Sequence, residues 1–309
     1  MDVGSDTMKR KLGVALSGGG MKAYVEIGVL RVLEQKNLKI DCISGTSMGS
    51  VIAALTACGA NVQELTRIML ELEKQFIDKQ VFLRPNLRVL PFAKNKADGF
   101  IDADIMEALF QKQLDQFNVT MMSDVKMPLV ITAVDLISGK LVIFTNVPKY
   151  FVTKKEWIIV SDVRLADAVR ASCTVPIVFN TKKLLEMQLV DGGVKMNLPV
   201  SPLRSLRCNR ILSISLDNEE EYQESSQLID VATRIITIMA KEINMRAKKL
   251  ADYNINVDVS NIAIFDVGKG DQCIEIGYGT ANEKWSEIEA AMAMKGVLGT
   301  IKEEIDKLI

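Results

Sequence analysis

The chain has 309 residues, of which 48% are hydrophobic and 25% are charged, and its formal net charge is −1. This length and composition are typical of a globular protein with one large domain or two ordinary ones. The near-neutral charge gives no general attraction to nucleic acid or to an anionic membrane, and we expect no nucleic-acid partner. The chain contains no histidine, which excludes a Ser-His-Asp triad and a histidine-bound zinc site.

The cysteine pattern and the first residues bear on the compartment. No apolar run reaches the length of a transmembrane helix. Residues 1–10 are polar, unlike a signal peptide, and we interpret them as a disordered leader. The five cysteines are odd in number, scattered and without metal-ligand spacing. We therefore expect reduced thiols in a cytoplasmic protein and no metal.

The first predicted strand covers residues 12–16 and leads into a run of glycines. Gly18, Gly19 and Gly20 separate it from a largely apolar helix predicted over residues 23–35. Backbone N–H groups at such a helix start can bind an anion. Phosphate or dinucleotide binding is the weaker interpretation, because neither G-x-G-x-x-G nor the P-loop pattern is present. The glycines can also form an oxyanion hole or a simple tight turn.

The pattern Gly45-x-Ser47-x-Gly49 follows a short strand-like run over residues 40–43 and precedes an apolar, helix-like run over residues 51–58. It is typical of a nucleophile elbow, in which a strained strand-to-helix turn exposes the serine hydroxyl. The glycines allow the neighbouring backbone to approach closely. We predict that Ser47 is a nucleophile, although the pentapeptide also occurs by chance in turns.

The region after the elbow helix changes character. Residues 61–75 have apolar residues at helical spacing and are predicted to form a helix, and a further helix is predicted over residues 103–116. Between them, the apolar and basic stretch 81–92 contains two prolines. We interpret residues 76–100 as a lid or insertion, with an irregular packing segment as the alternative.

The remaining predicted elements alternate between strands and helices. Strands are predicted over residues 128–135, 141–145, 184–190, 211–215 and 261–265, and helices over residues 162–171, 225–250 and 282–308. The first two strands flank a Ser138-Gly139 turn and are predicted to form a hairpin. The last two helices are predicted to pack against the sheet, with their methionines as core filler and a lipid-adaptive surface as the alternative. The alternation favours an α/β fold.

A carboxylate stands at the end of one predicted strand, in Asp191-Gly192-Gly193. Without histidine, the base for Ser47 has to be another group, and Asp191 is the candidate. Asp135, at the end of a buried strand, is the best competitor. A purely structural Asp-Gly turn is the common alternative at residue 191.

Three motifs, taken together, resemble the patatin-like phospholipase family: Gly18-Gly19-Gly20, Gly45-Thr46-Ser47-Met48-Gly49 and Asp191-Gly192-Gly193. The resemblance covers residues 12–215 and is less distinct in the C-terminal third. It implies a single catalytic domain over residues 11–309 with a three-layer α/β/α fold and a mainly parallel central sheet. It also implies hydrolysis of lipid acyl esters by a Ser47–Asp191 dyad, with Gly18, Gly19 and Gly20 as the oxyanion hole and no metal or cofactor.

The sequence departs from the family pattern G-G-G-x-R-G at Lys22 and Ala23. Lysine keeps the positive charge but lacks the planar fork of arginine. We expect a lipid or phospholipid substrate and transient peripheral contact with a membrane, and the oligomeric state stays open. Two further functions are compatible with the same motifs: an acyltransferase or thioesterase that uses the same dyad, and a non-catalytic lipid-binding module.

Overall fold

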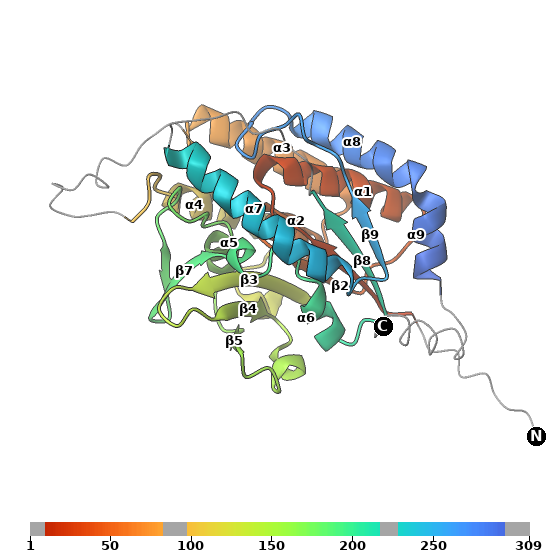
Figure 1. Cartoon of the computed structure of the whole chain (residues 1–309), viewed down its shortest axis with the longest axis horizontal. Helices are drawn as coiled ribbons and strands as arrows, with labels where there is room; N and C mark the ends of the chain where they lie inside the picture. The colour runs from red at the N-terminus through yellow and green to blue at the C-terminus, as the bar shows by residue number, and fades with distance from the viewer. Residues whose placement is uncertain (1–9, 83–97, 217–227, 294–309) are drawn as a thin grey trace, which may run out of the picture.

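A computed structural model of the chain describes residues 10–82, 98–216 and 228–293 (Figure 1). Their strands are β1 Leu12–Leu16, β2 Cys42–Gly45, β3 Leu129–Asp135, β4 Leu141–Thr145, β5 Trp157–Val160, β6 Lys182–Leu184, β7 Met187–Asp191, β8 Arg210–Ser215 and β9 Tyr253–Asn256. They form one sheet in the order β5-β4-β3-β2-β1-β8-β9, with β7 paired to β3 and β6 paired to β7.

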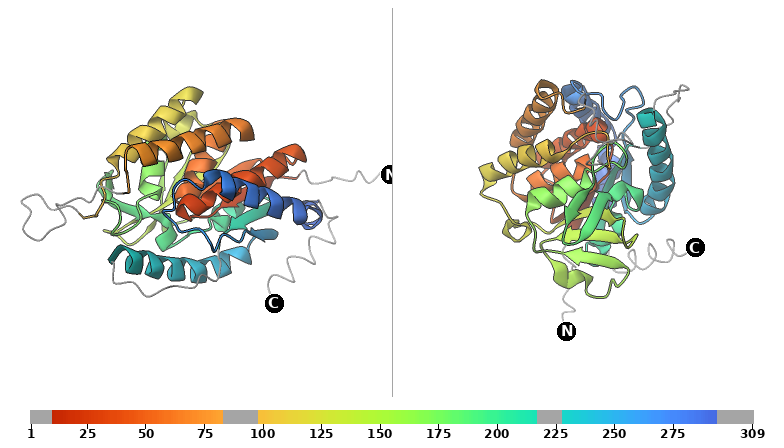
Figure 2. Two further views of the ribbon diagram at one scale, coloured as in Figure 1. Left: turned by 90° about the horizontal axis from the view of Figure 1, so that it is seen from above. Right: turned by 90° about the vertical axis from the view of Figure 1, so that its left-hand side faces the viewer.

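Helices cover both faces of this sheet. They are α1 Val25–Gln35, α2 Met48–Ala57, α3 Val62–Asp78, α4 Asp104–Leu114, α5 Leu165–Ser172, α6 Val200–Ser205, α7 Leu228–Lys248, α8 Gly270–Glu283 and α9 Trp285–Met292. The helices α1, α3 and α8 lie on one side of the sheet, whereas α7 forms a separate layer on the other (Figure 2). The protein therefore has the predicted three-layer α/β/α architecture.

The strand sequences explain why both faces are covered. Along β3, Leu129, Ile131 and Ala133 enter the core beneath α1, α2 and α5, while Val130 and Val134 enter the core on the α6 side. Successive side chains of a strand point to opposite faces, so a strand with apolar residues on both faces has to be buried on both.

The pairing of the strands brings the predicted site residues to one edge. The strands β8, β1, β2 and β3 are mutually parallel, and the predicted hairpin of β3 and β4 is confirmed as an antiparallel pair. Leu16 of β1 lies opposite Gly45 of β2, which in turn lies opposite Ile131 of β3. The loops that follow β1 and β2 therefore emerge side by side at the carboxyl edge, the usual place for a site in a parallel sheet.

Two C-terminal predictions are wrong. Residues 261–265 form a loop rather than a strand, and the backbone N–H of Met21 donates to the carbonyl of Ile264 at 2.8 Å. This loop packs on the glycine-rich segment. Its apolar residues are therefore explained by that contact and not by pairing in the sheet. The predicted helix over residues 282–308 is instead divided between α8 and α9, and residues 294–309 lie outside the described ranges.

Most of the predicted lid, residues 83–97, lies outside the described ranges. Residues 1–9 of the predicted leader lie outside them as well. The first residues of the predicted lid continue α3 to Asp78. Phe82 packs into an aromatic cluster with Phe76, Phe179 and Phe265, at ring-centroid distances of 5.8, 6.2 and 5.3 Å. Phe82 is half-buried and packs against the core.

Candidate active site

Ser47 lies between β2 and α2 in a conformation that non-glycine residues rarely adopt. Its backbone has φ 54° and ψ −131°, and it is the N-cap residue of α2. A positive φ at a non-glycine residue costs about 1–3 kcal/mol and persists where the surrounding structure enforces it. Such strained residues cluster at functional sites, which agrees with the elbow predicted from the sequence.

The two glycines of the elbow are required by close backbone approaches. A Cβ atom on Gly45 would collide with the carbonyl group of Gly49. A Cβ atom on Gly49 would lie 2.5 Å from the carbonyl oxygen of Ser17. The strand, the turn and the helix pack so tightly here that only glycine fits at both positions.

Hydrogen bonds from one distant residue and from the first turn of α2 hold the peptide groups of Ser47. Its N–H donates to the hydroxyl of Ser172, at the end of α5, at 2.8 Å. Its carbonyl accepts from the backbone N–H of Ser50 at 2.8 Å and from the Ser50 hydroxyl at 2.6 Å. These contacts oppose relaxation of the strained turn. The role of Ser172 was not apparent in the sequence, because the contact spans 125 residues.

Asp191 is the last residue of β7, which runs antiparallel to β3 and places Asp191 opposite Ala133. Since Ile131, two residues earlier on β3, lies opposite Gly45, this register brings Asp191 just beyond the end of β2. The Asp191 N–H donates to the carbonyl of Thr174 at 2.8 Å, and its Oδ1 accepts from the Gly193 N–H at 2.8 Å.

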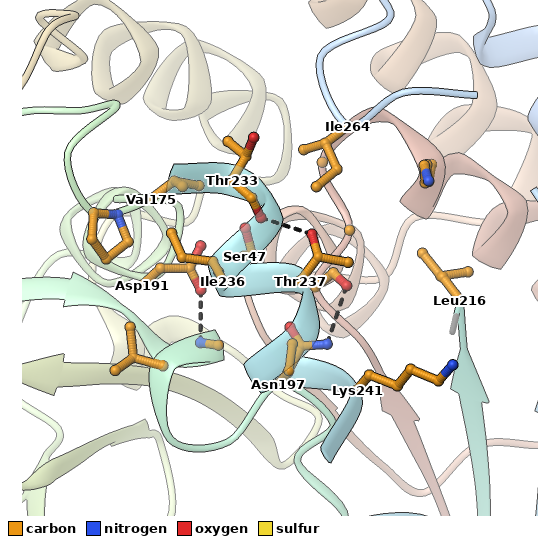
Figure 3. Close-up of a pocket in the computed structure, with 18 residues that line it drawn as sticks. Ser47, Val175, Asp191, Asn197, Leu216, Thr233, Ile236, Thr237, Lys241 and Ile264 are labelled. Atoms are coloured by element: carbon orange, nitrogen blue, oxygen red, sulfur yellow. Dashed lines mark hydrogen bonds between the residues drawn. The ribbon is translucent and has the colours of Figure 1, made fainter. Parts of the chain in front are cut away.

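Ser47 and Asp191 line one cavity of about 100 Å³ (Figure 3). Burial of the carboxyl group raises the pKa of Asp191 from 3.8 to about 6, although hydrogen bonds from the Gly193 N–H and the Ser47 side chain partly oppose the shift. Desolvation disfavours the charged form, whereas donors stabilise it. The carboxyl group is therefore ionised at neutral pH and is a stronger base than an ordinary aspartate.

The three glycines of the loop after β1 also line this cavity, but their amides differ. The Gly18 N–H donates to the carbonyl of Asn197 at 3.1 Å, and the Asn197 side-chain amide donates to the carbonyl of Gly18 at 3.3 Å. Within the described part of the chain, the amides of Gly19 and Gly20 have no such partner. Asn197, which sequence reasoning missed, thus fixes the loop beside Ser47.

Two ionisable groups lie beneath or beside the loop. Lys22 lines the cavity, and burial lowers its pKa to about 8, while Cys273 and Asp258 act in the opposite direction. Glu26 is fully buried and accepts from the Ser17 N–H at 2.7 Å; burial raises its pKa well above the ordinary value. The carboxyl group of Glu26 therefore supports the backbone that leads into the glycines.

Asp135, the competing candidate base, has a different environment. Its carboxylate accepts from the backbone N–H groups of Ile137, Ser138 and Gln188 at 3.0–3.2 Å, and from the Ser138 hydroxyl at 2.6 Å. It does not line the cavity of Ser47. Asp135 therefore stabilises the turn between β3 and β4.

The described residues provide neither a metal site nor a membrane span. In the ranges given above, no group of histidine, cysteine, aspartate or glutamate side chains has the arrangement of a metal site. Over the same residues, no helix has both the length and the apolarity to cross a bilayer.

Comparison with known proteins agrees with the motifs. The model of the patatin-like phospholipase family matches residues 14–204, which is more than half of the chain. The chain belongs to the patatin-like phospholipase family. The match includes the glycine loop, the elbow and Asp191, and membership of this family supports lipid hydrolase activity.

The chain is similar to several curated bacterial proteins. An uncharacterised NTE family protein of Mycobacterium tuberculosis is 26% identical over 212 residues, which are 68% of this chain and 50% of that protein. The uncharacterised protein YqhO of Bacillus subtilis is 27% identical, with 69% and 73% covered. A cUMP-AMP-activated phospholipase of Escherichia coli is 28% identical, with 64% and 58% covered. The chain thus spans about half the length of the mycobacterial relative.

Among solved structures, VipD from Legionella pneumophila aligns with a TM-score of 0.47 and 11% identity, over 90% of this chain and 67% of VipD. Human GIVD cytosolic phospholipase A2 aligns with a TM-score of 0.44 and 9% identity, over 95% of this chain and 59% of that chain.

Proposed function

We propose that the protein is a lipid acyl hydrolase of the phospholipase A or lysophospholipase type, which works through an acyl-enzyme on Ser47. The observation that carries the proposal is the placement of the strained Ser47 and the buried Asp191 in one cavity, where the Ser47 side chain helps to limit the rise in the pKa of Asp191. A nucleophile in contact with its base is the expected arrangement for covalent catalysis. No histidine exists to take this role.

In the first half-reaction, the Asp191 carboxylate accepts the Ser47 hydroxyl proton while Oγ attacks the ester carbonyl carbon. The carbonyl oxygen gains a negative charge, which the Gly19 and Gly20 amides stabilise. Gly18, whose amide is engaged by Asn197, positions the loop. The tetrahedral intermediate then collapses, the bond to the alcohol breaks, and Asp191 returns its proton to the leaving alkoxide.

In the second half-reaction, water replaces the alcohol. Asp191 accepts a proton from water as the water oxygen attacks the acyl carbon. The second intermediate expels the Ser47 oxygen, which recovers its proton from Asp191, and a fatty acid leaves. The pKa of about 6 suits both directions, because a base with a pKa near the working pH both accepts and returns a proton readily.

The charges in the cavity favour a phospholipid over a neutral glyceride. Lys22 and Lys241 line the same cavity as Ser47. Ammonium groups bind phosphate oxygens by strong, charge-assisted hydrogen bonds. A substrate with a phosphate headgroup is therefore expected to react faster than a triglyceride with the same acyl chain.

The proposal is tested by trapping the acyl-enzyme nucleophile. We expect a fluorophosphonate to form one adduct, which peptide mass spectrometry locates at Ser47, and expect Ser47→Ala to abolish it. Initial rates on a panel of phospholipids, lysophospholipids and neutral glycerides then define the substrate. An adduct on another serine, or hydrolysis by the Ser47→Ala protein at the wild-type rate, would refute the proposal.

A further inference from the structure

The helix α7 has apolar residues on two opposite sides. Its inner side covers the candidate active site, and five of its residues line the cavity: Thr233, Ile236, Thr237, Ala240 and Lys241 (Figure 3). On its outer side Val231, Ile235, Ile238 and Met239 are 39–52% exposed. Their spacing of i, i+4, i+7 and i+8 places these four side chains in one stripe along the helix. We call Val231, Ile235, Ile238 and Met239 the outer stripe.

The outer stripe is not covered by any described element, since α7 forms the outermost layer on its side of the sheet (Figure 2). Met245, further along the same side, is also 47% exposed, so the methionines of this helix are not the core filler expected from the sequence. Single exposed apolar side chains are ordinary, whereas a contiguous group of them marks an interaction surface.

The charge of α7 indicates what kind of surface the stripe contacts. Between residues 228 and 248 the helix has four basic residues (Arg234, Lys241, Arg246, Lys248) and two acidic ones (Asp230, Glu242), a net charge of +2 in a chain whose net charge is −1. Helices that combine an apolar stripe with basic residues bind in the interface of anionic lipid. Each basic residue near such a surface adds about 1 kcal/mol of attraction.

The small size of the cavity beneath α7 favours movement of the helix. Its volume of about 100 Å³ is below the range of roughly 300–1,000 Å³ for pockets that hold drug-sized ligands, so the cavity encloses only a small part of a lipid while α7 is in this position. A second cavity of about 440 Å³, bordered by Met196, Leu198 and Ile243, lies beneath the other end of the helix. This space leaves room for α7 to shift.

We propose that the outer stripe of α7 is the surface by which the protein docks on anionic lipid, and that docking moves α7 to open the cavity to a lipid from that surface. The inference rests on the proposed function, because opening the cavity matters only if Ser47, on the inner side of the same helix, acts on a lipid. The occupant is a lipid surface rather than a protein, since the basic charge and the adjoining site for a lipid ester both fit lipid.

The test compares two variants with matched losses of exposed apolar surface. The first, Ile235→Ser/Ile238→Ser/Met239→Ser, removes most of the outer stripe. The control, Ile137→Ser/Val152→Ser, changes side chains that are 70% and 79% exposed and lie outside α7. Both are made in the wild-type and the Ser47→Ala protein, so that binding is measured without hydrolysis. Circular dichroism and the melting temperature establish that each variant is folded.

Binding is measured by co-sedimentation with vesicles of phosphatidylcholine mixed with phosphatidylserine. We expect the stripe variant to bind about 100-fold more weakly, because three half-exposed apolar side chains no longer enter the interface. Binding by the control should match the unmodified protein. Hydrolysis of a soluble short-chain ester should stay within about twofold of wild type for both variants, while hydrolysis of vesicle lipid falls only for the stripe variant.

Vesicle binding by the stripe variant at the unmodified level would overturn the inference. So would a dimer in the unmodified protein that the stripe variant loses, because the stripe would then be an interface between two copies. As a second measurement, the tryptophan emission of Met239→Trp should shift to shorter wavelength on vesicles, and no shift would count against docking. If the proposed function fails instead, the short-chain ester is not cleaved even by wild type, while vesicle binding is unaffected.

Discussion

The nucleophile elbow and α7 border the same cavity, but they are held in opposite ways. Ser47 is only 7% exposed, its neighbours in α2 are buried, and hydrogen bonds fix both its N–H and its carbonyl. In α7 only Ala232 and Asn244 are buried among residues 231–248. A reacting group needs a fixed geometry, whereas an element that admits substrate needs a low cost of displacement. We therefore infer that the elbow carries the chemistry and that α7 controls access to the cavity.

The largest expected effect concerns the elbow. Ser47→Ala should lower the hydrolysis of a short-chain ester by about 10³-fold or more, since loss of a nucleophile leaves only the catalysis from binding and the oxyanion hole. Initial rates of the purified proteins measure this. Ser260→Ala, at an exposed serine outside the cavity, is the control and should keep the wild-type rate. Retention of the rate by Ser47→Ala would show that the elbow does no chemistry.

The second prediction concerns the rigidity of the elbow. Gly49→Ala should lower the free energy of unfolding by about 1–3 kcal/mol, because the new methyl group meets the Ser17 carbonyl oxygen at 2.5 Å. Gly279→Ala in α8 is the control: its methyl group meets nothing within 4 Å, so it should stabilise by about 0.5–1 kcal/mol. Urea unfolding measures both. Equal stability of the two variants would mean that the elbow is not tightly packed.

Asn197→Ala should have a smaller effect, on rate alone. It removes the side-chain bond to the Gly18 carbonyl but keeps the backbone bond between Asn197 and the Gly18 N–H. A loss of about tenfold in kcat is expected, equivalent to one hydrogen bond of about 1.5 kcal/mol. Steady-state kinetics on the short-chain ester measures it. An unchanged kcat would mean that the Asn197 side chain does not position the glycine loop for catalysis.

The last prediction concerns the pH dependence of stability. Because the pKa of Asp191 is raised to about 6 on folding, the folded protein binds this proton more tightly than the unfolded chain. The contribution of Asp191 is therefore most favourable below about pH 4 and is lost as pH rises to about 6. Asp191→Asn avoids the buried charge and should be slightly more stable than wild type at pH 8, by at most about 3 kcal/mol. Urea unfolding should show a smaller stability difference between Asp191→Asn and wild type at pH 4.5. A larger difference at pH 4.5 would mean that folding lowers the pKa of Asp191.

The parts predicted from the sequence were those that one short segment determines. Gly45 and Gly49 are required by close backbone approaches at the elbow. Their spacing around Ser47 therefore identifies the strand-to-helix turn without knowledge of the remaining fold. The apolar run of β3 similarly indicates a strand covered on both faces. Family membership, which the three motifs indicated together, is confirmed by the family model.

The parts that the sequence did not reveal depend on contacts between distant segments. The bonds from Ser47 to Ser172 and from Gly18 to Asn197 span 125 and 179 residues, and no local pattern shows which group either partner contacts. The loop over residues 261–265 was mistaken for a strand because its apolar residues pack on the glycine loop. The outer stripe of α7 has the same periodicity as a buried face, so only the structure distinguishes the two.

The central claim, that Asp191 acts as the base for Ser47, is tested most directly by the pH dependence of Ser47 labelling by a fluorophosphonate. In the wild type, the labelling rate should fall as pH decreases, with a midpoint near the Asp191 pKa of about 6. Asp191→Asn should label at least about 100-fold more slowly at pH 8 and lose this acid limb, while remaining folded. Labelling of Asp191→Asn at the wild-type rate with the same pH profile would contradict the account.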